Sequence, residues 1–511
     1  MTDPEQLRGE AQQCLRRGDI ERARQLLDQL AAADPGDWLS PVQLAELYES
    51  QGAFAAALDH ARQALERKPG DPKLLAKIGL LAQKAAQPEA AAAAYERAIA
   101  GDAAFRHLKF NLANCWFAVG RFSAAADAYE DVLAERPDHD VARANLAEAL
   151  EKLARYGEAQ RHADELLARA PVDPRWLALK GRLALREQQL DVAEDALSRA
   201  LASASSPADA PIRLNLASVH FEQKRYAEAL ARLNEIAGPV EPFPQALRLR
   251  FLCHYQAGAV SEALTSATDI FRSGNHESAM VALSLLPQLL LEAGRNDEAR
   301  ELLGLDTLLK LDRLELSAAS AEALKHTVHQ HPSLQFEPAT TSTHNGSQTE
   351  SLLDPATPEV NHLAEEIQVR IIRYAETCRG SDGPYARFLP AQGRLKMWAV
   401  ALNSGGYQGS HMHPHGVVSG VYYLQVPGAE DPDAGAIEMG RPESKFALRC
   451  DPMTRTVPVA TGDLVLFPSY LFHRTLPFDS PERRISIAFD LVPPTSPEWQ
   501  DPGLSAPFPL A

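Results

Sequence analysis

Three histidines in the last quarter of the sequence have the spacing expected of metal ligands. His411 and His413 form a His-x-His pair, and His473 follows in a separate, later segment. Because alternate side chains of an extended strand point to the same side, His411 and His413 can face one ion together. Imidazole nitrogens bind several first-row transition metals. One histidine alone is a weak signal, but an ordered set from two separate segments predicts a metal centre.

An arginine behind these histidines is suited to an acidic ligand. Arg484 comes soon after His473 in the sequence and stands two positions before Ser486. On a strand, the guanidinium and the hydroxyl would therefore point the same way. A guanidinium binds a carboxylate through two parallel hydrogen bonds. The pair predicts a carboxylate-binding pocket, with an ordinary ion pair as the alternative.

Short strands must position these side chains. From residue 395 onward, apolar or alternating runs are bounded by Gly, Pro and Asp, which is typical of strands joined by turns. Many short strands with such punctuation favour a sandwich or a jelly roll. The predicted strands are 396–402, 417–426, 436–439, 463–467 and 484–491, with a turn at 403–406.

Three stretches carry a family resemblance. His411–Leu424 reads HMHPHGVVSGVYYL, Gly462–Pro468 reads GDLVLFP, and Arg484–Phe489 reads RISIAF. They resemble the Fe(II)- and 2-oxoglutarate-dependent oxygenases that follow tetratricopeptide repeats. The resemblance covers about residues 330–493 and implies a double-stranded β-helix, or jelly roll. It also implies Fe(II) as the metal, 2-oxoglutarate as the cosubstrate and O2 as the oxidant.

The resemblance also implies roles for individual residues. His411 and His473 match the two iron-binding, catalytic histidines. Arg484 matches the arginine that binds the distal carboxylate of 2-oxoglutarate, and Ser486 matches the hydroxyl that assists it. Tyr423 matches a tyrosine that contacts the same carboxylate in related hydroxylases.

His413 departs from the usual pattern of the family. The common triad is His-x-Asp/Glu with a distant histidine, and this chain has an imidazole where the acid belongs. A neutral ligand leaves the iron one negative charge short. Three interpretations follow: His413 binds the metal, water fills its place beside His411 and His473, or the domain has lost catalysis. His415 is expected to line the pocket without binding the metal.

The first three fifths of the sequence repeat at a constant interval, which is the step from Asn111 to Asn145. Asn-Leu-Ala begins at both of these residues and again, two periods and two inserted residues later, at Asn215, while Gly52 and Gly120 are two periods apart. Apolar positions within a unit return every three or four residues, which indicates paired helices. The array resembles tetratricopeptide repeats, with about nine units from Pro4 to Lys310.

Such an array either binds a partner or serves as a spacer or dimer scaffold. Asn111, Asn145 and Asn215 occupy one position on the first helix of their units. A carboxamide offers one acceptor and two donor hydrogens, so this ladder could bind an extended peptide. We therefore predict a peptide or protein partner in a repeat groove.

Composition excludes several classes of protein. The net charge is −17, from 51 Lys and Arg against 68 Asp and Glu, which disfavours nucleic acids and anionic membranes as partners. Five scattered cysteines argue against a disulfide framework and a thiolate zinc site. The first residues lack the apolar stretch of a signal peptide, so a cytoplasmic location is expected.

Together these observations predict a multidomain α plus β protein. Residues 1–311 form an α-solenoid, 312–495 the jelly-roll oxygenase domain, and 496–511 a Pro-rich tail. The predicted function is a 2-oxoglutarate- and Fe(II)-dependent dioxygenase that hydroxylates a peptide or protein held by the repeats. The alternatives are a non-catalytic peptide-binding adaptor with a degenerate jelly roll, and a small-molecule oxygenase.

Overall fold

A computed structural model describes most of the chain, which divides into two compact units, Met1–Gln223 and Lys224–Ala511. The described residues are 4–17, 19–34, 36–203, 209–236, 244–338, 341–380, 385–428, 431–501 and 503–510.

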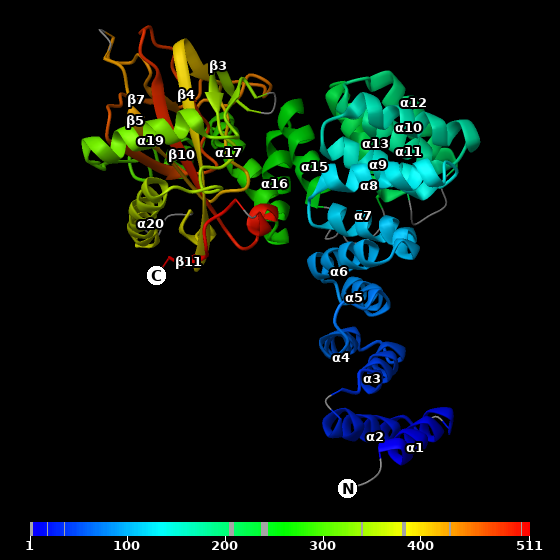
Figure 1. Ribbon diagram of the computed structural model, residues 1–511. Coiled ribbons are helices and arrows are strands. Elements are labelled where there is room, and N and C mark those ends of the chain that lie inside the picture. Colours follow the sequence, from blue (N-terminus) through cyan, green and yellow to red (C-terminus); the bar gives the residue numbers. More distant parts are fainter. Residues whose placement is uncertain are drawn as a thin grey trace. The chain divides into compact units, whose positions relative to one another are not determined.

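The first unit consists of successive helices, each packed on the next (Figure 1). Eighteen α-helices precede the first strand in the described part of the whole chain, which gives two helices for each of the nine predicted repeats. The helices of the first unit are α1 (Pro4–Arg17), α2 (Ile20–Ala33), α3 (Leu39–Ser50), α4 (Phe54–Arg67), α5 (Pro72–Lys84), α6 (Pro88–Gly101), the 3-10 helix η1 (Ala103–Leu108), α7 (Lys109–Ala118), α8 (Phe122–Glu135), α9 (Asp140–Lys152), α10 (Tyr156–Arg169), α11 (Pro174–Arg186), α12 (Leu190–Ser203) and α13 (Ala210–Glu222).

The period of the sequence is a period of the backbone as well. Gly52, Ala86, Gly120, Ala154 and Gln188 lie one period apart in turn and all have positive φ, at 74°, 55°, 78°, 55° and 58°. Each of these residues follows the first helix of a repeat and has the left-handed conformation, which glycine adopts without steric cost. The glycines noticed in the sequence therefore mark a turn that other residues also make.

Close helix crossings explain the small residues of the repeats. A Cβ added to Gly79 of α5 would lie 2.5 Å from the ring of Tyr95 in α6, and one on Gly181 of α11 would lie 2.5 Å from Leu197 in α12. Side chains cannot approach so closely, so these crossings require glycine. The predicted repeat of paired helices is confirmed in its local packing.

The second unit begins with helices and continues with the strands of the predicted jelly roll. Its helices are α14 (Tyr226–Asn234), α15 (Pro244–Ala257), α16 (Val260–Ser273), α17 (His276–Glu292), α18 (Asn296–Leu303), α19 (Ala318–Gln330), α20 (Pro358–Arg379), η2 (Ala386–Phe388) and η3 (Pro497–Gln500). Its strands are β1 (Lys310–Arg313), β2 (Gln335–Phe336), β3 (Thr343–Gln348), β4 (Gln392–Gln408), β5 (Val418–Gln425), β6 (Ile437–Met439), β7 (Arg455–Val457), β8 (Asp463–Pro468), β9 (His473–Thr475), β10 (Arg484–Val492) and β11 (Phe508–Pro509).

These strands form two antiparallel sheets. The larger has the order β1-β8-β5-β10-β4-β3-β2, with β11 on β4, and the smaller has the order β7-β6-β9. An isolated bridge between His411 and His473 adds the His411 segment beside β9. From β4 to β10 the chain passes repeatedly between the two sheets, which is the connectivity of a jelly roll. The predicted fold class, helical repeats followed by an antiparallel jelly roll, is confirmed.

Strand β10 lies between β4 and β5, and all of its residues are buried. Its odd-numbered residues Ile485, Ile487, Phe489 and Leu491 belong to an apolar core shared with α20. Its even-numbered residues therefore face the other side of the sheet.

One detail differs from the sequence-based prediction, and two further features extend it. The expected turn at 403–406 is part of the continuous strand β4, where Gly405 has φ +74° and the pairing with β3 shifts register. His473 begins the separate strand β9 and does not end β8. Residues 343–348, which look polar and loop-like, form β3 because they pair along β4. Local composition cannot show such pairing.

A loop of the jelly roll, residues 445–450, is docked on the first helices of the last repeats. The Gln256 side chain donates to the Lys445 carbonyl (2.9 Å) and accepts from the Ala447 amide (3.0 Å). The Tyr255 hydroxyl donates to the Ala447 carbonyl (3.0 Å). On α17, Gln288 donates to the Cys450 carbonyl (2.9 Å). The chain itself thus occupies this surface of α15 and α17.

An apolar core crosses the predicted boundary between residues 311 and 312. Leu283, Leu302 and Leu303 of α17 and α18 belong to the same buried cluster as Leu464 of β8. The boundary itself stays a prediction. The Pro-rich tail packs on the domain, since β11 pairs with β4 and Leu510 is fully buried.

All five cysteines are free thiols, as their scattered positions predict. Among the described helices, none combines the length and the apolar character needed to cross a bilayer.

The shared core predicts how the chain can be shortened. A chain of residues 224–511 should unfold cooperatively as a monomer, whereas residues 312–511 should aggregate. Removing α17 and α18 leaves several buried leucines without partners, each contributing about 1.5–3 kcal/mol of burial. Size-exclusion chromatography and thermal unfolding by circular dichroism would check both chains. A monomeric, cooperatively folded 312–511 would contradict the prediction.

Candidate metal and carboxylate site

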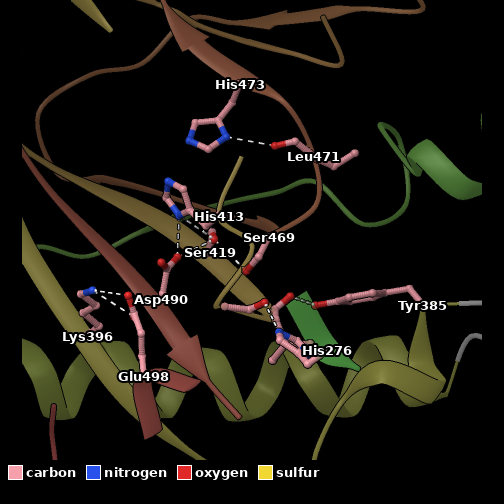
Figure 2. A network of polar contacts seen from close by, with 12 residues as sticks. His276, Tyr385, Lys396, His413, Ser419, Ser469, Leu471, His473, Asp490 and Glu498 are labelled. Carbon is pink, nitrogen blue, oxygen red and sulfur yellow. Dashed lines mark hydrogen bonds and ion pairs between the residues drawn. The ribbon is translucent and has the colours of Figure 1, made fainter. Parts of the chain in front are cut away.

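The three predicted histidines lie together in the jelly roll. Their candidate ligand atoms all lie within 4.8 Å of one another. The ring centroids of His411 and His473 are 4.2 Å apart, and that of His413 lies 5.2 and 5.0 Å from these two rings. The bridge between His411 and His473 brings two distant segments into register. Figure 2 shows the rings of His413 and His473 approaching each other from different segments.

Hydrogen bonds orient the rings of His411 and His473 in the same way. Nδ1 of His411 lies 2.8 Å from the Gly409 carbonyl, and Nδ1 of His473 lies 3.0 Å from the Leu471 carbonyl. A carbonyl only accepts, so both Nδ1 atoms carry the proton and both Nε2 atoms have a free lone pair.

Burial keeps these rings neutral. It is the main cause that lowers the pKa of His411 to about 4, and the nearby His413 lowers it further. Burial also holds the pKa of His473 well below its usual value. Neutral imidazoles whose lone pairs converge repel one another unless a cation lies between them. This donor set fits a transition-metal ion.

A buried carboxylate lies behind His413. Nδ1 of His413 is 2.7 Å from Oδ1 of Asp490 and 3.1 Å from the Ser419 hydroxyl. The Ser419 hydroxyl also donates to Asp490 (2.6 Å), and Ser469 lies 2.8 Å from Ser419 (Figure 2). With Nδ1 bound to the carboxylate, Nε2 of His413 is left for a metal.

Arg484 provides a buried cation without an acidic partner. It is 1% exposed, and no described carboxylate lies within ion-pair distance of it. Its Nε donates to the Gly435 carbonyl (3.1 Å), and its Nη1 lies 3.5 Å from the Ser486 hydroxyl. Burial lowers its pKa because the charge is poorly solvated. A buried charge of this kind requires a counter-ion.

Tyr423 has an unused polar group beside Arg484. The guanidinium carbon is 4.9 Å from the centre of the Tyr423 ring. The buried hydroxyl has no hydrogen-bond partner among the described groups. Burial raises the pKa of Tyr423 to about 12 although Arg484 opposes it, so the phenol is protonated and can donate. Arg484, Tyr423 and Ser486 together fit a carboxylate of a small ligand.

The histidines and the carboxylate-binding group share one narrow cavity. Its walls include His411, His413 and His473 at one part and Tyr423, Arg484 and Ser486 at another, together with Trp398, Gln408, Val421, Ile437, Thr475 and Ala488. The cavity has a volume of only about 10 Å³, so a ligand that touches a metal ion and the guanidinium at once requires the lining side chains to move apart.

A larger cleft of about 540 Å³ adjoins this cavity. Trp398 and His413 line both spaces. The cleft is also lined by His415, which is absent from the walls of the smaller cavity, and by Lys396, which is paired with Glu498 at 2.9 Å. It offers a path from the surface to the histidines.

The last repeats hold the histidine-bearing loops in place. Nε2 of His276 in α17 lies 2.9 Å from the Gly416 carbonyl, just after the first two histidines. The Tyr470 hydroxyl, just before His473, donates to the Leu302 carbonyl of α18 (2.6 Å). Two parts of the site are thus positioned by helices from outside the sheets.

Asp490 and Ser419 were not identified from the sequence. The sequence does contain a pattern that could have identified Asp490. It is the only acid in the apolar strand RISIAFDLV, and its even number places it on the same face of the strand as Arg484 and Ser486. Strand pairing is the missing information: β10 aligns Ser486 with Tyr423 and Asp490 with Ser419.

The three asparagines of the predicted groove lie on first helices of the first unit, at α7, α9 and α13. Asn111, Asn145 and Asn215 are half-buried. The Asn145 amide donates to Oδ1 of Asn114 (2.9 Å), which also accepts from the Tyr129 hydroxyl (2.6 Å). Asn145 therefore also contributes to packing between neighbouring repeats. Peptide binding by this ladder stays a prediction.

Comparisons with known proteins agree with this architecture. Residues 9–72, 77–140, 117–183 and 179–246 match families described as "Tetratricopeptide repeat", and residues 396–490 match the family described as "Putative 2OG-Fe(II) oxygenase". The chain carries tetratricopeptide repeats and a 2OG-Fe(II) oxygenase-family domain. The oxygenase-family match begins in β4 and ends at Asp490, so it contains all three histidines, Tyr423 and Arg484.

Individual relatives are more distant. Cellulose synthase operon protein C of Xanthomonas axonopodis pv. citri (strain 306) is 28% identical over 270 residues, which cover 49% of this chain and 18% of that protein. A tetratricopeptide repeat protein from Parabacteroides merdae is 15% identical with a TM-score of 0.36, covering 48% of this chain and 98% of its own. A prolyl-4-hydroxylase from Pseudomonas putida is 17% identical with a TM-score of 0.28, covering 38% and 98%.

The buried His276 predicts a pH-dependent stability. Burial lowers its pKa, so the unfolded chain takes up a proton below pH 6.5 that the folded chain resists. Stability should therefore fall as the pH drops below about 6.5, by up to about 1.4 kcal/mol per pH unit for this one group. His276→Gln keeps a donor for Gly416 and removes the titration.

Urea unfolding of metal-free protein at pH 7 and pH 5 checks this expectation. The loss of unfolding free energy between the two values should be smaller in His276→Gln than in the wild type. His326→Gln, at an exposed position of α19, is the matched control and should behave as the wild type. An equal pH dependence in both variants would show that His276 does not titrate on unfolding.

Proposed function

We propose that this protein is a 2-oxoglutarate- and Fe(II)-dependent dioxygenase. The observation that carries the proposal is the pairing, in one cavity, of three converging imidazoles with a buried guanidinium that lacks a described acid. The two ends of the cavity suit a dicarboxylate that reaches from a metal ion to the arginine once the lining side chains move apart.

Each group has a role in this proposal. His411, His413 and His473 would hold Fe(II) through Nε2 and would leave coordination positions open for a cosubstrate and O2. Arg484 would bind the distal carboxylate of 2-oxoglutarate, with Tyr423 and Ser486 donating to the same group. Their burial means that the carboxylate replaces water and is fixed in direction.

His413 is the ligand that the sequence left open. Its bond to Asp490 supports the interpretation in which it binds the metal, because the ring is oriented and Nε2 is free. The interpretations with water in its place and with lost catalysis have no comparable support.

Iron with 2-oxoglutarate supplies oxidative decarboxylation of the cosubstrate coupled to hydroxylation of a C–H bond. The chain's own contribution is position and exclusion of water. Val421, Ile437 and Ala488 give the cavity apolar walls between its polar ends. The adjoining cleft would admit the substrate beside His413 and Trp398.

The proposed cosubstrate pocket predicts that mutation of Arg484 lowers the affinity for 2-oxoglutarate. Under anaerobic conditions, the wild type with Fe(II) and 2-oxoglutarate should develop a visible charge-transfer band. Arg484→Ala should weaken 2-oxoglutarate binding by about 10- to 100-fold, because a charge-assisted bond contributes about 1.5–3 kcal/mol. Titration of the band would measure this change.

Arg483→Ala is the matched control for this experiment. Arg483 is the neighbouring exposed arginine and bonds to Asn403, so its loss should leave the titration unchanged. Absence of both the band and succinate formation in the wild type would favour the non-catalytic adaptor.

We further propose that the substrate is a peptide or protein recruited by the repeats. Tetratricopeptide repeats generally bind proteins, and α1–α13 provide an array of them. In the second unit, one repeat surface is already covered by residues 445–450. We therefore assign the partner to the repeat surfaces of the first unit, which residues 445–450 do not bind through these contacts.

The asparagine ladder gives the test of recruitment. Asn111→Ala, Asn145→Ala and Asn215→Ala combined should reduce hydroxylation of peptides several-fold, because three donors and acceptors are removed. The measurement is the number of peptides in a digested cell lysate that gain the mass of one oxygen atom.

A thermal melt of the triple variant must accompany this measurement, because Asn145 also bonds within the repeats. Asn234→Ala, at the end of α14, provides a single-site comparison outside the ladder. Unchanged peptide hydroxylation by a folded triple variant would favour a small-molecule substrate.

A further inference from the structure

The donor set raises a question of charge. Three neutral imidazoles bring no negative charge to a divalent ion, whereas the common triad of this chemistry includes a carboxylate. A carboxylate is nevertheless present behind one of the three imidazoles: Asp490 lies 2.7 Å from Nδ1 of His413.

Asp490 is held firmly in this place. It is 6% exposed, and its Oδ1 accepts from Ser419 at 2.6 Å. Burial and this bond favour the position of the carboxylate beside His413.

Asp490 has one close charge partner. Among the described residues its ion-pair partner is His413, while Lys396, which attracts the carboxylate from a greater distance, is paired with Glu498 at 2.9 Å. A carboxylate behind an imidazole makes the ring a more basic ligand and fixes its orientation. The charge can therefore act on the ion through the ring.

We propose that Asp490 is a positioning residue that supplies, through His413, the negative charge which the three directly binding side chains lack. The inference rests on the proposed metal site and adds the group that determines its affinity. In this chain the acid has moved from the ion to a place behind the imidazole.

The first test is the affinity for the metal alone. Asp490→Asn should bind Fe(II) about 10- to 100-fold more weakly than the wild type, measured anaerobically by competition with a chromogenic chelator. Asp501→Asn is the matched control, since Asp501 lines the same cleft but bonds to Gly503. It should keep the wild-type affinity.

The second test separates charge from structural support. In a His413→Ala background the imidazole that links Asp490 to the ion is absent. Asp490→Asn should therefore change Fe(II) affinity little in that background, although the same change weakens it in the wild type. A merely structural role would weaken binding in both.

The outcomes distinguish the inference from the proposed function. If the wild type binds Fe(II) and His411→Ala does not, while Asp490→Asn binds as the wild type, the metal site stands and the role of Asp490 is refuted. If the wild type binds no Fe(II), the proposed function itself fails. Should Asp490→Asn not fold, Ser419→Ala, which removes a donor to the carboxylate, should still weaken binding several-fold, and no change would contradict the inference.

Discussion

The convergence of three imidazole lone pairs is the constraint on which the rest of the second unit depends. Each ring is fixed by a bond at Nδ1, and the acceptors are two backbone carbonyls and one carboxylate. These acceptors exist only because separate segments meet. The bridge between His411 and His473, the buried Asp490 of β10 and the anchored loops all serve the same geometry.

Strand β10 sets the order of groups across the cavity. Because alternate residues share a face, its even positions place Arg484 at one end, Ser486 next, and Asp490 at the other end. Pairing with β5 adds Tyr423 beside Ser486 and Ser419 beside Asp490. One strand thus separates the site for an anionic ligand from the support for the metal, and its odd positions secure it in the apolar core.

Much of this could be predicted from the sequence. The repeat period and the order of His411, His473 and Arg484 are local or additive signals, and they indicated the architecture and the residues that meet. Two kinds of feature could not be predicted. Asp490 gains its place from strand pairing. The docking of residues 445–450 depends on contacts between parts of the chain that are far apart in sequence, which no local pattern encodes.

This docking has a consequence for which positions can vary. Gln256 and Gln288 grip main-chain groups of residues 445–450, and Tyr255 does the same. Side chains of the loop are engaged as well: Phe446 packs on Tyr255 and Phe472, Arg449 pairs with Glu292, and the Cys450 thiol lies 2.8 Å from the Gln288 amide. The helices therefore depend on the path of the loop and on the identity of three of its residues. A substitution on one side of this contact is tolerated only where the other side can still meet it.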